Sequence, residues 1–451
     1  MARRPVSSKK VLSEANLTAL GAGRLAEILL ETASPALKRR LRMELAAEAG
    51  APELAFELDK RLVALEASKT KVSWRKRPEL IAELQTLERM IVERLAALEP
   101  RLAFDRLVTW FDLYPSLSRR VTDSKGELSL AFDGATDDLA TLASEVGPSV
   151  AGPVLSEALS TRLSQWASWI GRGASALSPD LARRLLADLT QGKPRPTGRL
   201  ALVVRKLADR AGDLDAWVLS IPDADRSKPE IGAEIARRLA EARRPAEARA
   251  ALEASRIEEP TSRRSRSKGA SVPQPENWQA AEIAVLEAEG DGKAADEARW
   301  RLFERTLSED ILRSLLVKLP DFEDVVALDR AFEIASNYVD PMKGLSFLMS
   351  WPAQQEAAAM VRKRHTELRG SHNDIPLWAS RLSSRYPDAA LRLVRARATA
   401  LTHLGASADE LEGLIGEAEA LAAHAADPNI PSHEVFLATL RSSPMRRAVW
   451  R

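Results

Sequence analysis

Apolar residues recur at steps of three and four along most of this chain, which is the spacing of one face of an α-helix. The clearest example is residues 278–306, where two such patterns are separated by Gly290, Asp291 and Gly292. Glycine at this place ends a helix, so the pattern predicts a helix, a turn and a second helix. The apolar positions are Trp278, Ala281, Val285 and Ala288 in the first helix, and Ala295, Ala298, Leu302 and Thr306 in the second. We expect Trp300 and Phe303 to pack against a neighbouring unit.

Helix-starting signals continue the pattern on the C-terminal side. Ser308 precedes two acidic residues, as expected of an N-cap followed by a first turn in which the helix dipole favours negative charge. Asp321 is expected to cap the next helix. Four helices with short connections predict antiparallel hairpins stacked side by side.

The N-terminal half has the same character. Ser34-Pro35 and Ser178-Pro179 each combine an N-cap with a first-turn proline. The longest apolar stripe follows Pro78 and predicts one long amphipathic helix. Its members are Leu80, Leu84, Leu87, Ile91, Leu95 and Leu98.

A short sequence repeat supports a repetitive architecture. Glu247-Ala248-Arg249 with Leu252 returns as Glu297-Ala298-Arg299 with Leu302. A Ser-, Pro- and Arg-rich segment, residues 258–277, lies between them and has too few apolar residues to fold. Without it, the period is roughly 30 residues, near that of two-helix repeats.

We therefore predict an all-α fold, an α-solenoid of stacked antiparallel helix pairs similar to tetratricopeptide or HEAT repeats. The expected organisation is a disordered basic N-terminus (1–12), a helical region (13–257), a flexible insertion (258–277) and a helical-repeat region (278–451) that continues the first. Aromatic residues make up only 5% of the chain, which suits helix pairs sealed by Ala and Leu.

Composition narrows the functional classes. The chain has no cysteine, which excludes disulfides, thiol nucleophiles and zinc–thiolate sites. No apolar run approaches the roughly 20 residues that cross a bilayer, and the N-terminus lacks the apolar core of a secretory signal. A cytoplasmic protein without a membrane partner is expected.

Positive charge is concentrated in three short patches, at 3–10, 69–77 and 263–268, although the net charge is only +2. The rest of the chain is therefore acidic, which favours a basic ligand. In the middle patch, Lys69, Lys71, Arg75, Lys76 and Arg77 surround Trp74. This chemistry suits contact with a nucleic-acid backbone and one stacked base. Alternatively, Trp74 anchors the loop to the core while the cations remain solvated.

The third patch contains Arg263, Arg264 and Arg266, which serve either as a flexible basic arm or as solvated linker. The histidines lie in the last 90 residues without the i, i+4 spacing of metal ligands, so surface or packing roles are expected. No triad order, phosphate loop or metalloprotease motif occurs. We expect no catalytic residue, metal or cofactor.

Several segments also resemble an uncharacterised, mainly proteobacterial family of helical-repeat proteins whose function is unknown. The segments are Leu17–Arg42, Val72–Ile91, Trp300–Val325, Asp340–Pro352 and His433–Trp450. The resemblance implies an α-solenoid distantly similar to tetratricopeptide repeats and brings no catalytic residues. It also implies a basic and aromatic helix start near 405–420, where this chain instead has Gly405, Gly413 and Gly416.

Two functions are compatible with these observations. The first is a non-catalytic adaptor that holds a protein or peptide on a concave surface of stacked helix pairs. The second is a nucleic-acid-associated factor that uses the three basic patches, with binding that weakens steeply as salt rises.

Overall fold

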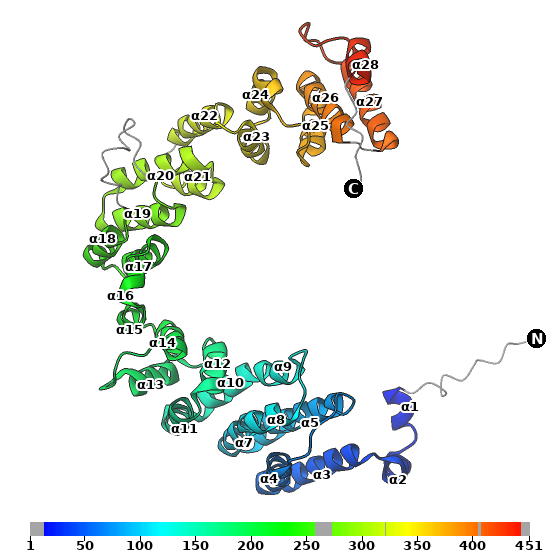
Figure 1. Cartoon of the computed structure of the whole chain (residues 1–451), viewed down its shortest axis with the longest axis vertical. Coiled ribbons are helices and arrows are strands. Elements are labelled where there is room, and N and C mark those ends of the chain that lie inside the picture. The colour runs from blue at the N-terminus through cyan, green and yellow to red at the C-terminus, as the bar shows by residue number, and fades with distance from the viewer. Residues whose placement is uncertain (1–12, 258–272, 321, 405–406, 443–451) are drawn as a thin grey trace, which may run out of the picture. The chain divides into compact units, whose positions relative to one another are not determined.

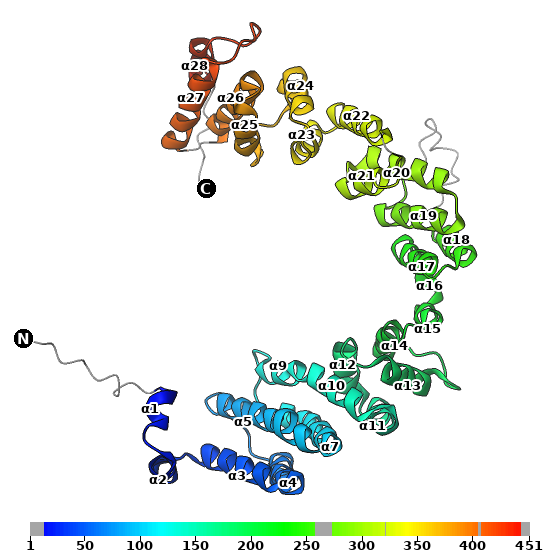
Figure 2. The same cartoon turned by 180° about the vertical axis from the view of Figure 1, so that it is seen from behind.

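The computed structural model describes residues 13–257, 273–320, 322–404 and 407–442. Helices account for nearly all regular structure in these ranges, and the only β-type pairing there is an isolated bridge between Val72 and Val121. The all-α prediction is confirmed. The chain divides into two compact units, Met1–Asp225 and Arg226–Arg451. In each unit, helices adjacent in sequence pack as neighbouring pairs (Figures 1 and 2), as an α-solenoid requires.

The helices of the first unit begin with α1 and end with α16, which reaches the unit boundary. Their bounds are α1 Glu14–Thr18, α2 Ala22–Thr32, α3 Pro35–Ala49, α4 Ala51–Ala67, α5 Arg77–Arg89, η2 Met90–Leu95, α6 Ala96–Leu98, α7 Pro100–Asp112, α8 Tyr114–Arg120, α9 Glu127–Gly134, α10 Thr136–Val146, α11 Pro148–Thr161, α12 Leu163–Gly173, α13 Pro179–Thr190, α14 Gly198–Ala211, α15 Leu214–Leu219 and α16 Asp223–Arg226.

The second unit contains residues 278–306, which include most of α19 and all of α20. Its helices are α17 Pro229–Glu241, α18 Pro245–Ala254, α19 Glu276–Glu289, α20 Gly292–Thr306, α21 Glu309–Leu316, α22 Glu323–Ser336, α23 Pro341–Ser350, α24 Gln354–Arg364, η3 His365–Glu367, α25 Ile375–Ser383, α26 Pro387–Leu404, α27 Ala408–Ala422 and α28 His433–Ser442.

Most of the predicted helix starts are confirmed. The hydroxyls of Ser34 and Ser178 accept hydrogen bonds from Leu37 N and Leu181 N. Ser308 lies at the N-cap of α21, but its hydroxyl makes no capping hydrogen bond. Asp321, the expected cap of α22, lies outside the described residues, and Phe322 occupies the N-cap with a left-handed φ of 74°.

The long amphipathic helix of the first unit is interrupted by a π-helical stretch. α5 continues through η2, which is π-helical, into α6. The predicted apolar stripe is buried from Leu80 to Leu95, and Met90 joins it. Leu98, predicted to belong to the stripe, is exposed. A π turn holds more residues than an α turn, so it rotates the residues that follow it away from the buried face.

An aromatic cluster forms part of the core of the first unit. Trp110 and Phe111 of α7, Phe132 of α9, and Trp166 and Trp169 of α12 are buried. The rings contact each other, with Trp110 and Phe132 centroids 4.2 Å apart. Trp166 and Trp169 are therefore packing residues of this core.

In the second unit, the repeated sequence occupies equivalent positions in two helix pairs. Ala248 and Leu252 of α18 are buried, as are Ala298 and Leu302 of α20. Arg249 binds Glu289 at 2.9 Å and Arg299 binds Glu287, so both arginines reach the C-terminal half of α19. Phe303 contacts Phe347 of α23 at 5.4 Å between centroids, which confirms packing on the next pair.

Residues 258–272 of the predicted insertion (258–277) lie outside the described residues, and α19 begins at Glu276, within the predicted range. The ends of the insertion are held together by the Gln274 side chain, which donates to Ile257 O at 3.0 Å and accepts from Ile257 N at 2.9 Å. α17, which precedes the insertion, packs against α19, which follows it. One stack of helices therefore continues across the insertion.

Candidate functional site

The first unit contains a groove of about 1160 Å³ among α3, α4, the connection 68–76 and α5. Its floor is formed by buried apolar side chains, which are Met43, Leu65, Leu80 and Leu87. Its lining is strongly basic. α3 contributes Arg39, Arg40 and Arg42, α4 contributes Lys60 and Arg61, the connection contributes Lys71 and Lys76, and Arg120 enters from the end of α8. The acidic residues of the lining are Glu57, Glu79 and Glu83.

Two of the three carboxylates form ion pairs, and these involve a minority of the cations. Arg61 binds Glu83 through two hydrogen bonds of 2.6 and 2.7 Å, and Arg39 shares the same carboxylate at 3.2 Å. Lys60 lies 3.7 Å from Glu57. The remaining rim cations, Arg40, Arg42, Lys71 and Lys76, form no ion pair with any residue that the structure describes. An excess of unneutralised cations in a concave surface attracts anionic ligands.

Arg120 holds the connection 68–76 in place. Its guanidinium donates to Leu65 O at 2.6 Å and to Ser68 Oγ at 3.2 Å, at the C-terminal end of α4. Its main-chain oxygen accepts from Val72 N at 2.9 Å, next to the Val72–Val121 bridge. Burial, and secondarily the neighbouring Arg61, lowers the pKa of Arg120. The connection is therefore fixed at both its start and its middle.

The residues predicted from the middle basic patch separate into two groups around the groove. Lys71 and Lys76 line it, whereas Lys69, Trp74 and Arg75 are exposed but outside its lining. Trp74 is 68% exposed, with the Arg75 guanidinium 5.2 Å from its ring centre. The interpretation of Trp74 as a core anchor is therefore wrong.

Arg77 is part of the fold. It is only 8% exposed and binds Glu127 of α9 through hydrogen bonds of 2.9 and 3.1 Å. It also donates to Thr122 O at 2.8 Å. The side chain therefore connects the start of α5 to the loop before α9 and is not available to a ligand.

Several predicted residues have no structural description. Arg263, Arg264 and Arg266, and the basic residues at 3–10, lie outside the described residues. Conversely, sequence reasoning missed the contribution of α3. The run Lys38-Arg39-Arg40 with Arg42 was visible in the sequence, but the helix pattern did not indicate which of its faces meets the connection 68–76.

The described residues contain no cluster of three or more His, Asp or Glu side chains that is arranged to hold a metal ion. The described histidines are dispersed; for example, His372 stacks on Trp378 and His424 contacts Ala420 O at 3.0 Å. Among the helices that the structure describes, none has the length and apolar character needed to span a membrane.

The second unit has a smaller and oppositely charged hollow. It measures about 300 Å³ and lies between α22 and α24. Asp329, Glu333 and Glu356 line it with a single cation, Lys363. The basic groove of the first unit and this hollow of the second unit therefore have lining residues of opposite net charge.

No curated protein and no solved structure matches this chain. A family model described as a family of unknown function does match, over residues 7–197 and 157–451, which together cover nearly the whole chain. The chain belongs to this family of unknown function, DUF6880.

Proposed function

We propose that this protein is a non-catalytic helical-repeat scaffold of the tetratricopeptide kind, and that its first unit binds an acidic peptide segment of a partner protein in the basic groove. The observation that supports this proposal is the combination of an apolar floor with a rim of unpaired cations. Arg40, Arg42, Lys71 and Lys76 provide the charge, and the buried side chains of Met43, Leu65 and Leu80 provide the floor. An amphipathic peptide that places apolar residues in a groove matches this arrangement.

The positive charge of the groove changes the charge expected of the ligand. The acidic remainder of the chain favoured a basic partner, but the groove favours an acidic one by charge complementarity. A nucleic acid is the second candidate, favoured by the exposed Trp74 beside Arg75. Single-stranded nucleic acids are usually bound through several stacking rings, and no aromatic residue lines the groove itself. The peptide is therefore the better match.

The test compares two double variants of the full chain that remove the same charge from the same connection. Lys71→Gln with Lys76→Gln alters the groove lining, and Lys69→Gln with Arg75→Gln alters exposed cations outside it. Fluorescence anisotropy measures binding of a glutamate-rich peptide, a lysine-rich peptide of equal length and a single-stranded oligonucleotide. The glutamate-rich peptide is expected to bind best, and more weakly as salt rises.

The groove variant is expected to lower the affinity for the acidic peptide about fivefold, since each rim ion pair contributes up to about 1 kcal/mol. The control variant is expected to leave it unchanged, and neither changes thermal unfolding. Preference for the oligonucleotide, with affinity lost in the control variant or in Trp74→Ala, would contradict the proposal and support the nucleic-acid function. Binding of no probe at low salt would also contradict it.

A further inference from the structure

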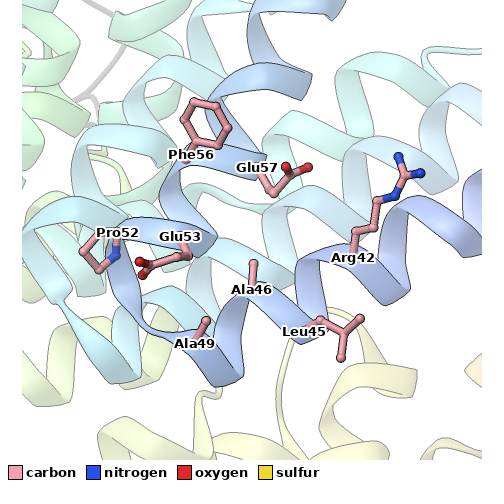
Figure 3. A pocket seen from close by; sticks show the side chains of 8 residues that line it. All are labelled: Arg42, Leu45, Ala46, Ala49, Pro52, Glu53, Phe56 and Glu57. Atoms are coloured by element: carbon pink, nitrogen blue, oxygen red, sulfur yellow. The ribbon is translucent and has the colours of Figure 1, made fainter.

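A second, apolar hollow adjoins the basic groove on the α3/α4 hairpin. It measures about 560 Å³ and lies along the second half of α3 and the first half of α4. Figure 3 shows Phe56 and Leu45 at opposite edges with Ala46 between them. Phe56 is 67% exposed and Leu45 is 71% exposed, although both are large and apolar. Ala46 and Ala49 leave room over the floor for a bulky side chain.

The two hollows meet on the same hairpin. Arg42 of α3 and Glu57 of α4 line both of them. A single extended ligand therefore passes from the groove into the apolar hollow without leaving the surface. The apolar hollow is thus a continuation of the proposed binding groove.

Charge changes sign along this path. The groove is lined mainly by cations, whereas Glu53 and Glu57 outnumber Arg42 around the apolar hollow. Glu53 lies in the first turn of α4 and forms no ion pair with any described residue. A ligand with negative charge along its whole length meets repulsion at this end, and a ligand with a cation there meets attraction.

We infer that the partner segment of the groove is a peptide with three parts in order: an acidic block, one bulky apolar residue and a basic residue. The acidic block binds the groove, the apolar residue covers Ala46 between Leu45 and Phe56, and the basic residue faces Glu53. This inference rests on the proposed function and adds the specificity of the ligand. A nucleic acid does not match it, because its backbone carries a phosphate at every step and has no aliphatic anchor.

The experiment uses the full chain and four labelled peptides. The first carries a glutamate block, a phenylalanine and two lysines; in the second alanine replaces phenylalanine, and in the third two glutamates replace the lysines. The fourth reverses the order of the three parts. Affinities are measured for the unaltered protein and for Phe56→Ala, Leu45→Ala and Glu53→Gln. These side chains are exposed or lie at the surface, so the variants are expected to fold, which thermal unfolding checks.

The first peptide is expected to bind about tenfold more tightly than the second, because the phenylalanine side chain removes apolar surface from water when it covers the open site. Phe56→Ala is expected to remove this difference and leave the salt dependence unchanged. Glu53→Gln is expected to reduce the preference for lysines over glutamates.

The outcomes separate the inference from the proposed function. If all four peptides bind equally and Phe56→Ala has no effect, the inference is wrong while acidic-peptide binding still stands. If none binds, the proposed function fails first. If Phe56→Ala instead changes the molar mass in light scattering, the hollow is an interface between copies of this chain, and the inference is overturned.

Discussion

Replacing Arg77 by glutamine tests how the two adjacent cations Arg77 and Lys76 differ. Arg77 is buried, with two hydrogen bonds to Glu127 and one to Thr122 O. Lys76 is exposed at the edge of the groove. Arg77→Gln is therefore expected to destabilise the first unit without acting on the groove, and Lys76→Gln is expected to weaken binding without destabilising the fold.

The magnitude follows from the surroundings of the ion pair. Breaking a fully buried pair costs about 3–5 kcal/mol, because one charge is left without a partner. Here the Glu127 side chain is 36% exposed, so water partly solvates the carboxylate that remains. Thr122 O loses a charge-assisted donor as well. We expect a loss of about 2–3 kcal/mol in the free energy of unfolding of the first unit.

Urea unfolding followed by tryptophan fluorescence and circular dichroism measures this loss. Lys76→Gln is the matched control and is expected to stay within about 0.5 kcal/mol of the unaltered protein. Glu127→Gln is expected to destabilise in the same direction as Arg77→Gln. The opposite result is that Arg77→Gln unfolds like the unaltered protein and instead reduces affinity for the acidic peptide, which would show that Arg77 is available to ligands.

Two further predictions concern stability. Burial, and then the neighbouring Asp138 carboxylate, raises the pKa of Glu88 to about 7; since this exceeds the unfolded value, stability is expected to fall as pH rises from about 5 through 7. Glu88→Gln should therefore stabilise the protein at pH 8 by about 1–2 kcal/mol, allowing for partial solvation, and have little effect near pH 4, as thermal unfolding at both pH values would test. Gly344→Ala in α23 places a Cβ 2.2 Å from Ala335 O, so it is expected to lower the free energy of unfolding by at least about 2 kcal/mol. Gly413→Ala in α27 meets no atom within 4 Å, so it is expected to raise the free energy of unfolding by about 0.5–1 kcal/mol. Equal urea midpoints for the two alanine variants would contradict this contrast.

Local features of the fold were predictable from sequence because their causes are local. The caps at Ser34 and Ser178 depend on hydrogen bonds to residues three positions away. The helix end at Gly290 depends on a positive φ that glycine adopts without strain. The π-helical stretch after Arg89 was not predictable, since apolar steps of three and four tolerate either helix type.

The candidate site was only partly predictable because it depends on contacts between distant segments. The pattern around Trp74 identified a basic patch, and Lys71 and Lys76 do line the groove. Arg77 was indistinguishable from them in sequence, since its burial depends on Glu127, 50 positions away. The share of α3 in the groove depends equally on how that helix packs against α4 and the connection 68–76.

Hydrogen–deuterium exchange of the full chain, with and without the peptide that carries the acidic block, phenylalanine and lysines, most directly tests the claim that the groove is the binding surface. Bound peptide is expected to slow exchange in residues 68–76 and at the starts of α3 and α5, with no change at the acidic hollow between α22 and α24. Protection confined to α22 and α24, or a bound peptide that leaves 68–76 unchanged, would contradict it.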